Sequence, residues 1–246
     1  MKVSALLTAI DTMDQAETDA EAQEILERAL AACGFEFYAL LRTPRPHEHP
    51  FNVVIIGNFP SGWAELYVKR KYVLIDPVIR YLGRAQSGFH WAEAAAAFSH
   101  DAHARRMSRM MAEAQKYGLE DGYLFPVHGR RGLLAQLSVG GRPNELSASE
   151  IALFDGLATR LYWRLFDIRA GKTGTAPDTG FDVKLTHREM EALHYLSDGM
   201  TSPEIASILE ISNHTVDWYM NGIQQKLKAK NRHHAVAIAF RLGLIS

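Results

Sequence analysis

The stretch Leu185-Thr186-His187-Arg188-Glu189-Met190-Glu191-Ala192-Leu193 opens the C-terminal quarter of this chain of 246 residues. Thr186 and Glu189 form a capping box, in which each of the two side chains satisfies a backbone N–H group at the start of a helix. Apolar residues then recur at helical spacing as far as Asp198-Gly199, a pair typical of a helix end. We therefore expect a helix that is capped by Thr186.

Two further helices are expected directly after the first. Thr201-Ser202-Pro203-Glu204 combines a hydroxyl cap, a proline at the first helical position and an early carboxylate, which together start a short helix. Ser212 then caps a third helix, and the apolar residues expected on its buried stripe are Val216, Met220, Ile223 and Leu227. Two helices joined by so short a turn are typical of the helix-turn-helix, a DNA-binding unit.

The face of the third helix opposite its buried stripe is free to contact another molecule. In a helix-turn-helix this helix enters the major groove, where polar side chains pair with base edges and nearby cations meet phosphates. The candidate DNA-binding residues are His214, Thr215, Asp217, Trp218, Asn221, Gln225, Lys226, Lys230 and Arg232. The alternative is a protein-binding helical bundle with a solvated basic end, because residues 182–246 contain seven basic and seven acidic residues.

Several motifs of this segment occur at fixed spacing. They are Leu185-Thr186-x-Arg188-Glu189-x-Glu191-x-Leu193, Gly199-x-Thr201-x-x-Glu204-Ile205-Ala206, Ile211-Ser212-x-x-Thr215-Val216 and Lys226-Leu227. This pattern resembles the DNA-binding domain of LuxR-type transcription regulators. The resemblance implies a four-helix domain that recognises a palindromic promoter site as a dimer and acts with RNA polymerase. Asp217 stands where a basic residue is common in that family, and Tyr219 where many members have His, which concerns the target sequence more than the fold.

Composition excludes several other classes of protein. A hydrophobic content of 47% is ample for a core, and the length predicts about two domains. No apolar run approaches the length of a membrane span, and the first residues do not form a signal peptide, so we expect a cytoplasmic protein. Cys33 is the only cysteine, which excludes an internal disulfide and a cysteine-based zinc cluster; no metal and no resident cofactor are expected.

The first 168 residues combine helical patterns with short β-rich segments. Two helices are expected at 3–14 and 18–33, and strands at 35–41, 51–56, 122–127 and 133–140. The class is therefore α+β, and the resemblance implies an α-β-α sandwich around an antiparallel sheet. The expected domains are 1–168 for ligand binding and dimerisation, a linker at 169–181 that is rich in glycine and threonine, and 182–246 for DNA binding.

A capping box at Ser147 and Glu150 starts a helix that is expected to end near Ile168. Its apolar residues Ile151, Phe154, Ala158, Leu161, Leu165 and Ile168 alternate at spacings of three and four. Such a seam is typical of helix packing. Other faces of the helix are apolar as well, through Leu153, Leu157, Tyr162 and Trp163, so one side can pack on the sheet while another meets a partner chain, which favours a homodimer. The alternative is that all of these residues belong to the core of their own domain.

Aromatic residues surround one acidic residue in the middle of the first domain. Trp63, Tyr67, Tyr72, Asp76 and Trp91 form this set, and on pattern alone aromatic residues are more often core than ligand site. LuxR-type receptors of N-acyl-homoserine lactones carry a Trp, a Tyr four residues later, an Asp-Pro thirteen after the Trp and a second Trp fifteen after the Asp. All three spacings are present here, and Gly122 matches a downstream glycine of the family.

The resemblance implies roles that suit the chemistry of an acyl-homoserine lactone. Asp76 would accept the amide N–H, and the Trp63 indole would donate to the lactone carbonyl, while Tyr67 and Trp91 would enclose the ring and chain. Ser138 aligns with a position that bonds the amide or acyl oxygen. Phe59 stands where several members use a Tyr hydroxyl, so Tyr67, Tyr72 or Ser138 would have to replace that bond. We also expect a buried Asp76 to be unpaired without such a ligand.

Other functions are left open by these patterns. His47-x-His49, His100-x-x-His103 and His233-His234 lie in no catalytic frame, so an enzyme is not expected. A phosphorylation-gated regulator would need an early acidic pair and alternating strands and helices. The closer alternatives are a regulator of the same architecture that answers a non-lactone or host-derived molecule, or one that needs no ligand. The acyl chain, the direction of regulation and the operator are not predicted.

Overall fold

The computed structural model describes residues 1–44, 50–129, 132–173 and 185–245, which fall into two compact units. The first unit holds nearly all described residues before 174, and the second holds those after 184. Each unit has its own hydrophobic core. The predicted Pro-rich loop at 45–49 and the predicted linker residues 174–181 lie outside the described part of the chain.

A five-stranded sheet forms the centre of the first unit. Its strands lie in the order β2-β1-β5-β4-β3, and the pairs β1–β2, β1–β5 and β3–β4 are antiparallel. Their bounds are Phe37–Arg42 for β1, Val54–Asn58 for β2, Phe89–His90 for β3, Asp121–Gly129 for β4 and Gly132–Gly141 for β5. Side chains alternate between the two faces of each strand, so every strand contributes to two separate layers.

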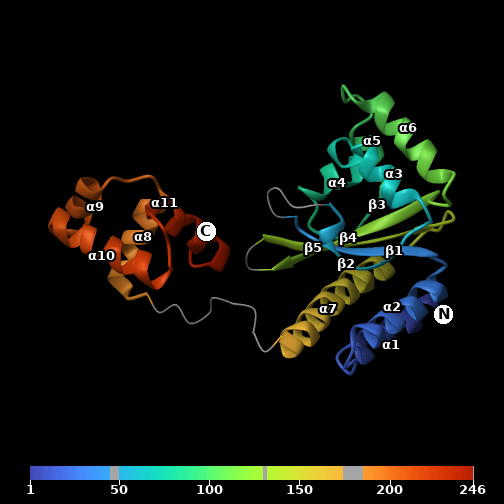
Figure 1. Ribbon diagram of the computed structural model, residues 1–246, viewed down its shortest axis with the longest axis horizontal. Helices are drawn as coiled ribbons and strands as arrows, with labels where there is room; N and C mark the ends of the chain where they lie inside the picture. Colours follow the sequence, from blue (N-terminus) through green and yellow to red (C-terminus); the bar gives the residue numbers. More distant parts are fainter. Residues whose placement is uncertain (45–49, 130–131, 174–184, 246) are drawn as a thin grey trace. The chain divides into compact units, whose positions relative to one another are not determined.

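Three helices cover one face of the sheet (Figure 1). They are α1 (Lys2–Met13), α2 (Asp19–Cys33) and α7 (Ala148–Thr173), and they pack on one another as well as on the sheet. Phe125 and Leu137 point from the sheet into this layer, where they meet Phe154 of α7. This is the larger of the two layers and forms the main core of the unit.

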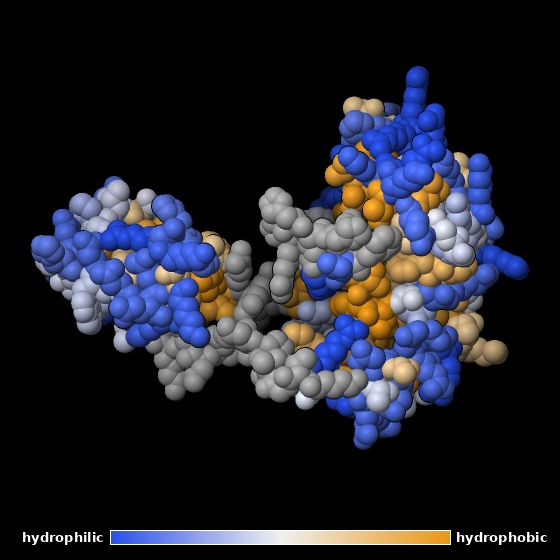
Figure 2. All heavy atoms as spheres, viewed as in Figure 1, coloured by the Kyte–Doolittle hydropathy of each residue, from blue (hydrophilic) through white to orange (hydrophobic). Residues whose placement is uncertain are grey.

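The opposite face is covered by α3 (Trp63–Lys69), α4 (Pro77–Leu82), α5 (Trp91–Ala97) and α6 (Ala104–Gln115), with one-turn 3₁₀ helices at Pro50–Val53 and Tyr72–Leu74. Figure 2 shows hydrophobic residues gathered at the level of the sheet, between more hydrophilic surfaces on the two helical layers. The expected fold, an α-β-α sandwich around an antiparallel sheet, is therefore confirmed.

Four helices form the second unit, as the sequence predicts. They are α8 (His187–Ser197), α9 (Ser202–Leu209), α10 (Asn213–Lys226) and α11 (Arg232–Leu242). The capping boxes of Thr186 with Glu189 and of Thr201 with Glu204 are both present, and Ser212 caps α10. Val216, Met220, Ile223 and Leu227 are at most 5% exposed, which confirms the predicted buried stripe.

Several predicted boundaries are wrong. Residues 51–53 form a 3₁₀ turn, so the second strand begins only at Val54, and the two-residue strand β3 was not predicted. Helix α7 continues to Thr173, five residues beyond Ile168, so the predicted linker begins inside a helix. Gly171 lies within α7, so a glycine in this stretch does not end the helix.

The predicted seam of α7 packs inside its own domain. Phe154, Ala158, Leu161 and Leu165 are at most 1% exposed and belong to the core shared with α1, α2 and the sheet. The seam is therefore the side of α7 that packs on its own domain, and the homodimer stays a prediction. A different face of the helix carries Trp163, which is 41% exposed and contacts the rings of Tyr162 and Phe166.

Candidate functional site

Four of the predicted site residues meet where α3, the turn after it and α4 converge. The ring of Trp63 lies 5.9 Å from that of Tyr67 and stacks on that of Tyr72 at 6.3 Å. Tyr67 and Tyr72 are in turn 6.0 Å apart. Asp76 follows directly, because its backbone N–H bonds to the carbonyl of Tyr72 and its side chain caps α4. We call Trp63, Tyr67, Tyr72 and Asp76 the aromatic–acid cluster.

Asp76 is the buried acidic group of this cluster, with 8% of its surface exposed. Its Oδ1 accepts the Val78 N–H at 2.8 Å, and its Oδ2 accepts the Tyr67 hydroxyl at 2.8 Å. The expectation that this carboxylate is unpaired on its own is therefore wrong. Burial raises the pKa of Asp76 above its usual value, although hydrogen bonds from the Tyr67 hydroxyl and from the Val78 and Ile79 backbone act in the opposite direction. Each carboxylate oxygen has a second lone pair, so the group retains capacity for one more N–H donor.

The hydroxyls of the two tyrosines are already engaged by carboxylates. Tyr67 donates to Asp76, and Tyr72 donates to Glu113 on α6. Burial raises the pKa of Tyr67 well above its usual value, and the charge of Asp76 adds to this effect. Both tyrosines are therefore neutral hydrogen-bond donors to the protein itself. Three hydroxyls were expected to replace the one absent at Phe59. Those of Tyr67 and Tyr72 are engaged, and only the Ser138 hydroxyl has no hydrogen-bond partner among the described residues.

Trp91 packs closely against two glycines of the sheet. A Cβ on Gly122 would lie 2.7 Å from the Trp91 ring and 2.2 Å from the carbonyl oxygen of Val139, and a Cβ on Gly140 would lie 2.4 Å from the same ring. Gly122, which the sequence singled out, therefore leaves the space that the Trp91 indole occupies. The indole Nε1 is buried and has no hydrogen-bond partner in the described structure.

Ser138 faces the same helical layer as Trp91. Its neighbours Leu137 and Val139 point into the main core, so Ser138 and Gly140 point to the other side. The register pairs Ser138 with Ala39 and Ala39 with Gly57, which gives a row of small side chains across three strands.

Phe59 is not part of the aromatic–acid cluster in any described contact. It is 37% exposed, and its ring stands over Gly57, whose Cβ, if present, would lie 2.9 Å away. Tyr117 takes a place that the sequence did not predict, with its ring 5.6 Å from that of Trp63. Tyr117 follows the end of α6, more than fifty residues from Trp63, and no local spacing connects the two.

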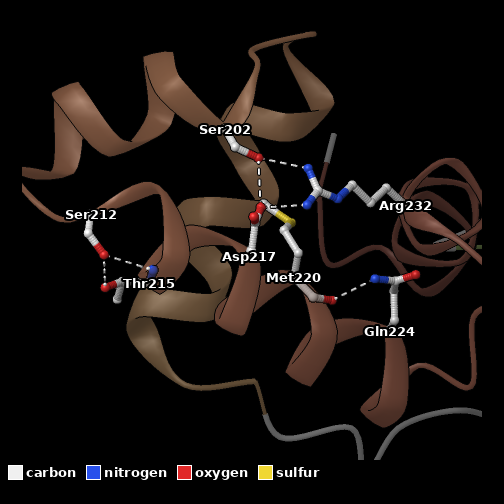
Figure 3. A network of polar contacts seen from close by, with 7 residues as sticks. All are labelled: Ser202, Ser212, Thr215, Asp217, Met220, Gln224 and Arg232. Carbon is white, nitrogen blue, oxygen red and sulfur yellow. Dashed lines mark hydrogen bonds and ion pairs between the residues drawn. The ribbon is translucent and has the colours of Figure 1, made fainter.

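The recognition helix α10 presents the predicted polar face to solvent. Trp218 is 70% exposed, and His214, Asn221 and Gln225 are also exposed. Thr215 is half-buried and shares a hydrogen bond with the capping hydroxyl of Ser212 (Figure 3). Lys230 is exposed just beyond the helix.

Three of the predicted DNA-binding residues form ion pairs within the unit. Figure 3 shows Asp217 of α10 and Arg232 of α11 facing each other, with Ser202 of α9 bonded to both. The guanidinium donates to Asp217 at 2.6 Å and to the Ser202 hydroxyl at 2.7 Å. The bond from Arg232 also lowers the pKa of Asp217, so this residue is charged. Lys226 donates to the buried Glu189 of α8 at 2.6 Å.

These two sites define a class of protein in which one chain joins a small-molecule domain to a helix-turn-helix. Residues 18–165 match the model of the autoinducer binding domain, and residues 183–239 match that of the bacterial regulatory proteins of the luxR family. The chain belongs to the LuxR family of autoinducer-binding transcription regulators. It is therefore a DNA-binding regulator and not an enzyme.

Known relatives share the whole architecture. The quorum-sensing regulator RhlR of Pseudomonas aeruginosa is 33% identical over 227 residues, which cover 90% of this chain and 88% of RhlR. The transcriptional activator BjaR1 of Bradyrhizobium diazoefficiens is 30% identical over 227 residues, or 92% and 90% of the two chains.

Solved structures share the fold. SdiA of Escherichia coli superposes with a TM-score of 0.64 at 24% identity, covering 99% of this chain and 98% of that one. The N-acylhomoserine lactone-dependent factor CepR2 of Burkholderia cenocepacia has a TM-score of 0.50 at 26% identity, covering 69% and 98%. Within the described residues, no helix is long and apolar enough to cross a membrane, and no three His, Cys, Asp or Glu side chains form a metal site.

Proposed function

We propose that the autoinducer of this regulator is an N-acyl-homoserine lactone, and that Asp76 accepts its amide N–H. The observation that carries the proposal is a buried carboxylate inside an aromatic cluster, with lone pairs left after its two protein hydrogen bonds. A neutral amide N–H suits such an acceptor, because it adds a charge-assisted hydrogen bond without bringing a second charge into an apolar site.

The other polar groups of the site suit the remaining parts of this ligand. The indole N–H groups of Trp63 and Trp91 can only donate, and neither has a partner among the described residues, so they serve the lactone and acyl carbonyls. Ser138 supplies a hydroxyl on the sheet side. Tyr67 acts through Asp76, whose carboxylate it orients, and Tyr72 and Phe59 supply apolar surface.

The amide contact is tested by replacing the N–H of the ligand. We would titrate the full chain with an acyl-homoserine lactone and with its ester analogue, in which oxygen replaces the amide nitrogen, for wild type and Asp76→Asn. Wild type should bind the amide more than tenfold more tightly, since loss of a bond to a charged group costs about 1.5–3 kcal/mol. The variant should bind both ligands with similar, weak affinity.

The control and the contrary results follow from the same pair of ligands. Asp11→Asn, an exposed change on α1, should keep the wild-type preference. Equal binding of amide and ester by wild type would mean that Asp76 does not accept the amide N–H. Binding of neither would favour the alternative that the domain answers a different small molecule or none.

On the DNA side, we propose that two copies of α10 read a palindromic site. Asn221 and Trp218 are exposed on the free face of the helix and are the residues best placed for base contacts, with His214 and Gln225 beside them. Lys230 is available for a phosphate. Asp217, Arg232 and Lys226 meet DNA only if they leave their present partners, so we assign them a supporting role in holding α10.

The Asn221→Ala variant tests the reading of bases. It should lose preference for the operator by about 1–3 kcal/mol while it keeps most of its affinity for random DNA, because a base-edge contact is lost and the phosphate contacts remain. An equal loss on both DNAs would contradict the assignment. Gln225→Ala, one turn further along α10, measures how far along the helix base reading extends.

A homodimer is required for a palindromic site. We propose that the exposed side of α7, centred on Trp163, contributes to the contact between the two ligand-binding domains. The exposed indole and the adjoining, partly buried rings of Tyr162 and Phe166 form an apolar surface that the domain covers only in part. Contact with RNA polymerase at the promoter completes the proposed function.

A further inference from the structure

Gln136 lies on the face of β5 that α3–α6 cover, and its side-chain amide is buried. Its exposed fraction is 9%, and its Oε1 accepts no hydrogen bond in the described structure. Ala135 and Leu137 on either side point into the main core, so Gln136 points to the layer that contains Ser138 and Trp91. An amide at such a position costs stability, because it gives up hydrogen bonds to water and receives none in return.

Gln136 follows Gly140 and Ser138 along the same face of β5. Gly140 lies under Trp91, Ser138 comes next on the same face, and Gln136 is two residues beyond Ser138. Two residues along a strand span roughly 6.6 Å. Gln136 is thus further from Trp91 than Ser138, the residue expected to bond the amide or acyl oxygen of the ligand. It lies where the outer part of an acyl chain would run.

We propose that Gln136 selects an autoinducer whose acyl group carries a hydroxyl beyond the carbons next to the amide. This inference rests on the proposed lactone function. A hydroxyl donates to Oε1 and can accept from the amide NH₂, so it satisfies the glutamine in either orientation of the amide. An unsubstituted alkyl chain leaves the same amide buried and unpaired, which penalises its binding.

The proposal is tested with pairs of N-acyl-homoserine lactones of equal chain length, from butanoyl to decanoyl, with and without a terminal hydroxyl. Calorimetric titration of the full chain should show that wild type prefers the hydroxylated member of at least one pair by about tenfold. Gln136→Leu, which has a similar size and no polar atom, should abolish or reverse this preference. Gln115→Leu, an exposed change on α6, should retain it.

Each outcome is decisive. If wild type binds both members of every pair equally, or if Gln136→Leu keeps the preference, the role of Gln136 is overturned while the lactone function stands. If no lactone binds to wild type, both the role of Gln136 and the proposed lactone function are overturned. A second measurement needs no ligand: Gln136→Leu should melt at a higher temperature than wild type, and a lower melting temperature would mean that the amide has a structural partner and would overturn the proposal.

Discussion

At the scale of single residues, the ligand-binding domain combines a buried acid with two tryptophans whose indole N–H groups have no hydrogen-bond partner among the described residues. Asp76 is held by Tyr67 and by the N-terminus of α4, so its position is fixed by the protein. Trp91 is fixed in another way, because two glycines remove the side chains that would displace its ring. Spacing in the sequence predicted both residues, and the structure supplies the physical reason for Gly122.

Replacement of Gly122 by Ala should destabilise the first domain. The added Cβ would lie 2.2 Å from a backbone oxygen that cannot move without shifting β5, and overpacking of this kind costs about 2 kcal/mol. Urea unfolding followed by tryptophan fluorescence measures the loss. Gly171→Ala on α7 is the control, since nothing lies within 4 Å of that Cβ, and it should be neutral or slightly stabilising. Similar unfolding midpoints for the two variants would contradict the packing described for Trp91.

Asp76 should also give the domain a distinct pH dependence. Burial raises its pKa, so its contribution to stability is complete below the ordinary carboxyl pKa and is lost as pH rises through the raised value. Asp76→Asn cannot ionise, so its melting temperature should fall less than that of wild type between about pH 4 and pH 7. Melting curves across this range, with Asp11→Asn as the exposed control, provide the test. Parallel profiles for wild type and Asp76→Asn would mean that this acid ionises freely.

At the scale of elements, helix starts were predictable because capping is local. The boxes at Ser147, Thr186 and Thr201 each lie within four residues of sequence, and all three helices begin there. Ion pairs between helices were not predictable, because Lys226 and Glu189 are 37 residues apart and helical periodicity carries no information on their contact. This is why the sequence assigned Lys226 to DNA phosphates, whereas the structure shows it bound to another helix.

The Lys226–Glu189 pair should stabilise the helix-turn-helix unit. Glu189 is 5% exposed; burial alone would raise its pKa, yet the bonds from Lys226 and Thr186 outweigh this and lower it. Lys226→Met leaves the carboxylate without its cation and should cost about 1–2 kcal/mol, discounted because the lysine is partly exposed. Lys230→Met, an exposed change close by, should alter stability by less than about 0.5 kcal/mol. Chemical denaturation measures both, and equal effects would argue against the pair.

At the scale of the whole molecule, the fold class and both types of domain were predictable, and the dimer contact stays a prediction. The seam from Phe154 to Leu165 has the spacing of an interchain helix pair, but α1, α2 and the sheet cover it first. Periodicity identifies an apolar face and does not say whether the same chain or another one buries it. The exposed ring of Trp163 lies on another apolar face of α7, one that the sequence offers to a partner chain.

Trp163→Glu should weaken the dimer. A charge at the centre of an apolar contact would be buried without a partner, so the variant should sediment as a monomer at concentrations where wild type is dimeric. Trp218→Glu is the matched control, because it also replaces an exposed tryptophan but lies on α10, and it should leave the dimer intact. Dimers of equal strength in all three proteins would place the contact elsewhere.

The central claim is that the first domain is a receptor for an acyl-homoserine lactone that Asp76 recognises. Thermal melting of the full chain against straight-chain, branched and aryl lactones tests it most directly, for wild type and Asp76→Asn. Ligand at a hundredfold excess over its dissociation constant stabilises the folded domain by about 2.7 kcal/mol, so one lactone should raise the wild-type melting temperature by several degrees and have no effect on the variant. The absence of a shift with every lactone, or an equal shift in the variant, would contradict the account.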